Sequence, residues 1–96
     1  MYGRIATVWI KPGMEQEFLH GLRNQGVPTV MALGCLRVDV YLDTSRRQAL
    51  VTTLWPTREA AEAAPRSTRW QELRARLDET LESESSVRIM YRALTD

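Results

Sequence analysis

The sequence is poor in the residues that form disulfides and metal sites. It contains one cysteine, Cys35, and one histidine, His20, among 96 residues. A lone cysteine excludes an intramolecular disulfide and suits a reducing compartment, and the two residues offer no paired spacing typical of structural zinc. We therefore expect a cytoplasmic protein with no metal site, in which Cys35 is a small buried apolar residue.

Membrane and nucleic-acid partners are disfavoured as well. No apolar run approaches the roughly 20 residues that cross a membrane, and the N-terminus lacks the basic and then apolar pattern of a secretory signal. The 13 Lys and Arg residues nearly balance the 12 Asp and Glu residues, so the net charge of +1 gives no reason to expect nucleic acid. No glycine-rich phosphate loop is present, and we expect no cofactor.

Apolar patterning predicts a single domain, residues 1–96, with four strands and three helical regions. The strands are expected at 2–10, 35–42, 48–55 and 87–94, with a hairpin loop at 43–47 and a polar linker at 82–86. The helical regions are expected at about 14–33 with an interruption at 26–28, at 57–64, and from Thr68 along the apolar stripe of Trp70, Leu73, Leu77 and Leu81.

Local signals mark the ends of these segments. Pro56 removes a strand donor directly after Trp55, and Thr57 can then cap a helix by accepting a hydrogen bond from the backbone. Thr68, with Gln71 three residues later, has the spacing of a capping box. Trp55 is thus expected at a rigid strand end beside a helix start, where an indole can either floor a pocket or fill a core.

The element order is β-α-β-β-α-β, which is the ferredoxin-like α+β plan with a four-stranded antiparallel sheet. Helices in this plan cover only one face of the sheet. Several of the strands nevertheless carry apolar residues on both faces. A long apolar face left in water is an aggregation liability, so we expect a second copy of the chain to cover it in a homodimer.

Three local patterns, in this order and spacing, resemble the antibiotic biosynthesis monooxygenase family of dimeric α/β-barrel proteins. They are Pro12-Gly13 after the first strand, Gly34-Cys35-Leu36 before the second, and Trp55-x-Thr57-x-x-Ala60 after the third. The resemblance implies two sheets packed face to face in a homodimer, and a pocket in each subunit between sheet and helices. It also implies small-molecule chemistry, since some members oxidise anthrones or quinols with oxygen and no cofactor, and others degrade haem.

The resemblance places Ala6 and Ala64 where haem-degrading members carry an asparagine and a histidine. Haem iron needs an axial ligand such as histidine, so we expect weak haem binding at most. Many other members also have a histidine near Ala64. Its absence here leaves open whether the chain is catalytic.

Aromatic residues are the first candidates for a substrate site. Trp55 matches the family tryptophan, and we assign it the catalytic role of stacking on a flat substrate, with core filling as the alternative. Trp9 and Trp70 are candidate substrate-binding residues, although Trp70 lies on an apolar helical stripe that usually means core.

Polar candidates are fewer. Tyr41 shares a strand face with Arg37 and Asp39, which predicts either a substrate-binding cluster or an ion pair at a subunit interface. Arg74 is a further substrate-binding candidate, or a solvated partner of nearby carboxylates. His20 lies about 200° around its helix from Phe18 and is expected in solvent rather than as a catalytic base.

Three functions follow from these residues. The first is a cofactor-independent monooxygenase acting on a planar phenolic or quinol compound, and the second is a polyketide cyclase on the same barrel. The third is a homodimer that binds or stabilises a small aromatic ligand without chemistry. Oxygen consumption separates the first from the second, and unchanged release of a tightly bound ligand would identify the third.

Overall fold

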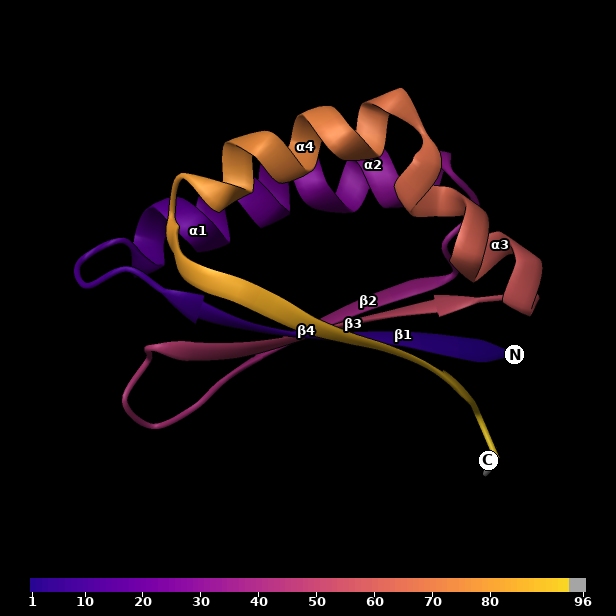
Figure 1. Ribbon diagram of the computed structural model, residues 1–96, viewed down its shortest axis with the longest axis horizontal. Helices are drawn as coiled ribbons and strands as arrows, with labels where there is room; N and C mark the ends of the chain where they lie inside the picture. Colours follow the sequence, from indigo (N-terminus) through magenta and orange to yellow (C-terminus); the bar gives the residue numbers. More distant parts are fainter. Residues whose placement is uncertain (94–96) are drawn as a thin grey trace.

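A four-stranded antiparallel sheet forms one layer of the protein, and helices cover one of its faces (Figure 1). The computed structural model describes residues 1–93, apart from the side chains of residues 83–85. The strands lie in the order β2-β3-β1-β4, with bounds Tyr2–Ile10 for β1, Arg37–Leu42 for β2, Gln48–Trp55 for β3 and Leu81–Tyr91 for β4. This topology confirms the ferredoxin-like α+β prediction.

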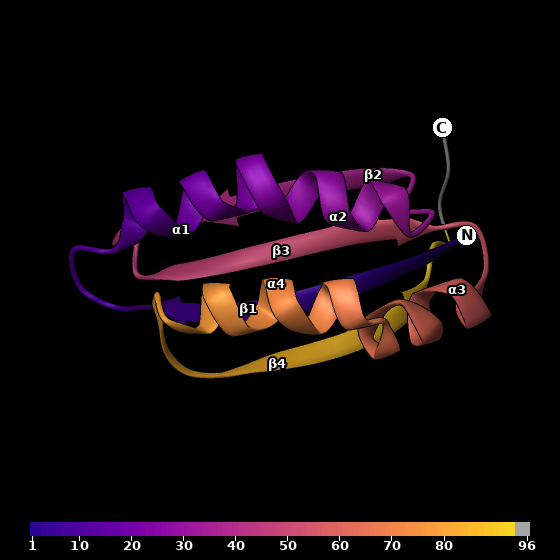
Figure 2. The same cartoon turned by 90° about the horizontal axis from the view of Figure 1, so that it is seen from above.

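The helices form the second layer. Their bounds are Glu15–Gly21 for α1, Leu22–Gly26 for the π-helical turn η1, Val27–Ala32 for α2, Arg58–Ala63 for α3, Ala64–Arg66 for the 3₁₀ turn η2 and Thr68–Asp78 for α4. Seen from above, α1 and α2 run beside α4 across the sheet (Figure 2). No helix in the described part of the chain is long and apolar enough to cross a membrane.

The first helical region changes its winding between two glycines. The predicted interruption at 26–28 is present, but it takes the form of the π-helical turn η1, and α2 restarts at Val27 with Pro28 in its first turn. A Cβ added at Gly21 would lie 3.1 Å from Leu77 Cδ2. Gly21 therefore allows α1 to pack closely against α4.

Side-chain caps fix the starts of α3 and α4. Thr57 caps α3 as predicted, because its Oγ1 accepts from the Ala60 backbone N–H at 3.1 Å. The predicted cap at Thr68 is wrong by one residue, since Ser67 Oγ accepts from the Trp70 N–H at 3.1 Å. Ser67 has the extended backbone of an N-cap, φ −71° and ψ 149°, whereas Thr68 is already the first residue of the helix.

Two strand boundaries also differ from the prediction. β2 begins at Arg37, and Cys35 before it turns into the core while Leu36 is exposed, so the predicted alternation does not extend back to residue 35. β4 begins at Leu81, so residues 82–86 are not a linker but pair with β1 in the sheet. An edge strand tolerates polar residues, which is why their composition misled the sequence prediction. The predicted end of this strand, Leu94, lies outside the described residues.

The core has two parts beneath the helices. One lies under α1 and consists of Val8, Ile10, Phe18, Leu22 and Ala49. The other lies under α2 and α3 and consists of Val30, Cys35, Trp55, Ala61 and Ala64. Strand alternation and helical periodicity place these side chains on the facing sides of the two layers.

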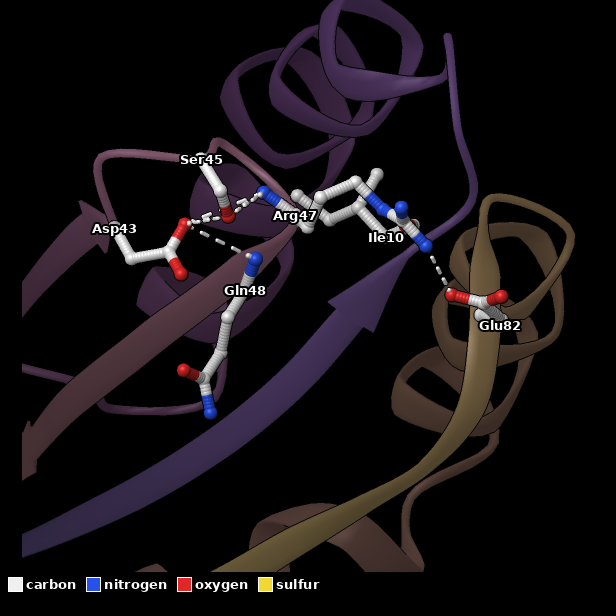
Figure 3. A network of polar contacts seen from close by, with 6 residues as sticks. All are labelled: Ile10, Asp43, Ser45, Arg47, Gln48 and Glu82. Carbon is white, nitrogen blue, oxygen red and sulfur yellow. Dashed lines mark hydrogen bonds and ion pairs between the residues drawn. The ribbon is translucent and has the colours of Figure 1, made fainter.

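Arg47 connects the β2–β3 hairpin to the far edge of the sheet (Figure 3). Its Nε donates to the Ile10 carbonyl at 3.2 Å, and its Nη2 pairs with Glu82 Oε2 of β4 at 2.6 Å. Asp43 closes the hairpin by accepting from the Ser45 hydroxyl at 2.7 Å, which holds the pKa of the Asp43 carboxyl below its ordinary value. The loop predicted at 43–47 is thus confirmed as a hydrogen-bonded turn.

Candidate functional site

A cavity of about 120 Å³ opens between the sheet and the helices. Its wall is apolar over most of its area and is formed by Ala6, Val8, Phe18, Leu22, Gly26, Val27, Val30, Val38, Val51, Trp70, Leu73, Leu77, Leu81 and Val87. The polar side chains that line it in the described part of the chain are Arg4, Thr53, Arg74 and Asp78. An apolar hollow with a few placed polar groups is the usual form of a small-molecule site.

Arg4 supplies the positive charge that lies deepest in this cavity. It belongs to β1, where the strand period of two places it on the same face as Ala6 and Val8. Its guanidinium carbon lies 5.2 Å from the ring centroid of Trp70, a cation–π distance. Burial lowers the pKa of Arg4 from its ordinary value, and the nearby Arg74 lowers it further.

Helix α4 contributes five of the lining residues, and three of them are spaced four residues apart. Trp70, Arg74 and Asp78 therefore follow one another along a single helix face. Arg74 Nε and Asp78 Oδ2 are 3.8 Å apart, and both side chains are more than half exposed, at 56% and 57%. This pair lies toward solvent, whereas Trp70 and Arg4 are half-buried. Two of the predicted substrate-binding residues, Trp70 and Arg74, are thus at the cavity.

Trp55 occupies a different position from the one expected of a stacking residue. It is 0% exposed and packs in the core with Ala61 and Ala64, outside the set of cavity-lining residues. Its ring centroid lies 6.4 Å from that of Trp70 at an angle of 46°. The indole thus lies in a supporting position behind the cavity wall in this structure, and the stacking role of Trp55 stays a prediction.

Trp55 contacts the cavity wall through a hydrogen bond to Thr53. The Trp55 Nε1–H donates to Thr53 Oγ1 at 2.9 Å, and Thr53 is itself buried in the cavity wall. A threonine hydroxyl carries one donor hydrogen in addition to its acceptor lone pairs. Among the described residues this is the one hydrogen bond found for that hydroxyl, so its own hydrogen can serve a bound molecule.

Trp9 and Tyr41 lie on the opposite face of the sheet. They are 43% and 59% exposed, and neither lines the cavity between sheet and helices. In β1, Trp9 lies between the buried Val8 and Ile10, so the strand period of two turns it outward. The structure therefore does not bring these two residues to this cavity, and their substrate-binding role stays a prediction. Beside Tyr41, the predicted polar pair is present, with Arg37 Nε 2.8 Å from Asp39 Oδ2.

This uncovered side of the sheet, the open face, carries large apolar side chains. By register it includes Ile5, Trp9, Tyr41, Leu50, Leu54 and Met90. All helices in the described chain lie over the other face (Figure 1). Four of these residues, Trp9, Tyr41, Leu50 and Met90, are among the exposed large apolar side chains.

The remaining sequence candidates divide between surface and core. His20 is exposed and lies within hydrogen-bond distance of the Asn24 side chain, which confirms the predicted solvent position. Cys35 is buried, as predicted, and burial raises the pKa of its thiol. Of the two alanines considered in the sequence, Ala6 lines the cavity and Ala64 packs in the core.

Sequence reasoning missed Arg4 and Thr53. The strand period of two could have placed both on the core face of the sheet. Arg4 lies on the same face of β1 as Val8 and Ile10, and Thr53 lies on the same face of β3 as Val51 and Trp55. The two residues are direct neighbours in the β1–β3 register. Only the three-dimensional pairing reveals that they lie together against Trp70 and Arg74.

Comparison with known proteins gives a family and a fold. The family model for antibiotic biosynthesis monooxygenase matches residues 1–76. A variant of SnoaB, a cofactor-independent oxygenase from Streptomyces nogalater, superposes with a TM-score of 0.82 at 12% identity, covering 98% of this chain and 94% of that one.

Two further solved structures are similar. A protein of Bordetella bronchiseptica has a TM-score of 0.85 at 21% identity, with 97% of each chain covered. Rv0793 from Mycobacterium tuberculosis has a TM-score of 0.78 at 19% identity, with 98% of this chain and 96% of that one covered. At these identities the likeness establishes the shared fold. No match was found among curated proteins.

Proposed function

Because the chain belongs to the antibiotic biosynthesis monooxygenase family, we propose that it oxidises a small planar phenol or quinol with molecular oxygen and no cofactor. The observation that carries this proposal is the apolar cavity in which Arg4, Trp70 and Arg74 meet. Trp70 offers a flat aromatic surface for a ring. The guanidinium group of Arg74 stabilises the oxyanion from which oxidation starts.

The reaction needs electrons from the substrate itself. An ionised quinol passes electrons to oxygen, one oxygen atom bonds to a ring carbon, and the other leaves as water. In balance, one hydroquinone and one dioxygen give one hydroxybenzoquinone and one water. The substrate loses four electrons and dioxygen gains four, so no external reductant is consumed.

The reaction needs a base that accepts the phenol proton. Among the described lining residues Asp78 is the one carboxylate, and no histidine lines the cavity. Asp78 lies at the solvent side beside Arg74, where it can accept the phenol proton and release it to water.

The cavity volume restricts the substrate. At about 120 Å³ it is close in size to the roughly 150 Å³ cavity that accepts benzene and below the range of about 300–1,000 Å³ typical of drug-sized ligands. A single ring fits these dimensions better than a three-ring anthrone. We therefore favour a monocyclic quinol.

The proposal includes a homodimer in the cytoplasm. The open face has the apolar residues that a second sheet would cover, and face-to-face packing of two sheets places such side chains in a shared core. The buried thiol of Cys35 is compatible with a reducing compartment. Two cavities, one in each subunit, would lie outside this interface.

Oxygen uptake with hydroquinone as the substrate tests the activity, in the presence of a chelator and after removal of free flavin. We expect one dioxygen consumed per quinol, hydroxybenzoquinone as product and no accumulated peroxide. The variants Trp70→Leu and His20→Ala form a matched pair, because Trp70 lines the cavity and His20 is exposed elsewhere. Activity lost in the first variant and retained in the second supports the proposal, whereas equal activity in both contradicts the site.

Ligand binding without chemistry is the second candidate. The observation that favours it is that the described cavity wall has one base, Asp78, and that base faces Arg74. In that case quinols bind and are recovered unchanged under oxygen. The cyclase alternative is separated by the same assay, since cyclisation consumes no oxygen.

A further inference from the structure

The charges around the cavity do not balance. Its charged lining residues in the described chain are two arginines, Arg4 and Arg74, and one aspartate, Asp78. Arg74 pairs with Asp78 along α4. Arg4 has no carboxylate partner among the residues whose side chains the structure describes, and its contact is the face of Trp70. One positive charge is left over at the deeper, half-buried position.

A half-buried guanidinium without an anion is costly. Removing a charge from water is unfavourable unless the charge is paired, and the cation–π contact offsets only part of that cost. A second guanidinium nearby adds repulsion, which is the reason that Arg74 contributes to the lowered pKa of Arg4. A bound anion would remove both penalties at once.

The position of Arg4 over the Trp70 ring is compatible with binding that anion. Guanidinium groups use their flat face against an aromatic ring and keep their N–H donors in the plane, where they match the two oxygens of a carboxylate. Thr53 lies opposite Arg4 in the β1–β3 register and lines the same cavity. Its hydroxyl hydrogen is a third donor on the same side.

We propose that the ligand of this cavity is a monocyclic aromatic carboxylate, with its carboxylate bound by Arg4 and Thr53 and its ring against Trp70. One unpaired positive charge matches a monoanion, and a dianionic phosphate ester would leave excess negative charge. The apolar wall accepts the ring, and about 120 Å³ leaves room for little more than one ring and its substituents. This inference rests on the proposed function for treating the cavity as the substrate site.

Two probes that differ only in the anionic group test it. These are 2,5-dihydroxybenzoate and hydroquinone, which share the ring and both hydroxyls. Binding is measured by calorimetry on the intact protein without oxygen, at pH 7 and low salt. We expect the carboxylate to bind at least tenfold more tightly than hydroquinone. Equal affinities, or tighter binding of hydroquinone, would overturn the inference.

Substitutions test whether Arg4 is the source of the preference for the carboxylate probe. Arg4→Gln should bind both probes equally, whereas Arg76→Gln, a matched loss of charge on α4 whose side chain contacts Gln25 instead, should keep the preference. Arg4→Lys should retain part of it, because the charge remains without the planar fork. A full preference in folded Arg4→Gln would contradict the assignment. If Arg4→Gln does not fold, the Arg4→Lys variant is the test. An undiminished preference of Arg4→Lys for the carboxylate probe would exclude recognition by the planar guanidinium group.

A third probe separates carboxylate from phosphate. If 4-hydroxyphenyl phosphate binds more tightly than 2,5-dihydroxybenzoate, the proposed monoanion is wrong. Ligand binding and oxygen uptake are measured separately for each probe. A carboxylate preference without oxygen uptake would refute the oxidation proposal and support this one, whereas oxygen uptake at equal efficiency for both probes would support oxidation and refute this one.

Discussion

The hydrogen bond between Trp55 and Thr53 predicts how a core tryptophan supports the cavity wall. Both residues are buried, the indole completely, and Nε1 lies 2.9 Å from Oγ1. Trp55→Phe removes the donor and keeps an aromatic ring, whereas Thr53→Val removes the acceptor and keeps the shape. Together they form a double-mutant cycle around one bond.

Each single change leaves one buried group without its partner. Thr53→Val should lower the free energy of unfolding by about 1–3 kcal/mol, the cost of a buried N–H with no acceptor. Trp55→Phe should cost about 2 kcal/mol, less than the roughly 3–5 kcal/mol of full truncation to alanine. The double variant removes both partners, so its loss should fall short of the sum by about 1 kcal/mol.

Urea unfolding measures these differences, at one protomer concentration throughout because the stability of a dimer depends on concentration. Circular dichroism at 20 °C first checks that every variant is folded. Additivity within about 0.5 kcal/mol would refute the coupling and with it the role assigned to this bond. Strong loss of ligand binding in folded Trp55→Phe, together with normal binding in Trp70→Leu, would restore the stacking role to Trp55.

Three further predictions concern the dimer, a turn and the thiol. Leu50→Lys on the open face should give a monomer by light scattering on a size-exclusion column. Met31→Lys, at an exposed apolar site on α2 (47% exposed, against 36% for Leu50), should leave the dimer intact, and a dimeric Leu50→Lys would contradict this interface. Gly34→Ala should lower the unfolding free energy by about 1–2 kcal/mol in thermal melts, because Gly34 has φ +104°. The raised pKa of the Cys35 thiol means that the folded state loses stability as pH rises above the unfolded pKa of about 8.5. The free energy of unfolding of wild type should therefore fall relative to that of Cys35→Ala between pH 7 and pH 9.5. A difference between the two proteins that does not change with pH would refute this prediction.

Much of the fold was predictable because its signals are local. Runs of apolar and β-branched residues, each ended by a proline turn, located β1 and β3 at their observed bounds, and Thr57 marked the start of α3. The errors fall where local signals were ambiguous. Ser67 and Thr68 are both good caps, and only the backbone conformation selects the first. The polar residues 82–86 form a strand because β1 offers a partner along its length, which no local pattern reveals.

The candidate site was predictable only in part. Trp70 was a candidate as an aromatic residue, although its apolar stripe favoured the core, and Arg74 was a candidate as a cation for an acidic substrate. The structure places both at the cavity. The position of Trp55 behind the cavity wall was not predictable, because a strand end beside a helix start does not say which side of the layer an indole fills. The open-face positions of Trp9 and Tyr41 were not predictable as a site either, since an apolar residue on a sheet with two apolar faces can belong to either face.

The sequence by itself determined the element order, the excess of apolar residues over what one layer of helices can cover, and the resemblance to a family of barrel proteins. These depend on composition, periodicity and spacing, which act over a few residues. Tertiary structure alone decided that Arg4 of β1, Thr53 of β3 and Trp70 of α4 surround one cavity, and that Trp55 lies behind it. Strand pairing and layer packing join residues far apart in the chain, and the energy of those contacts is absent from any local pattern.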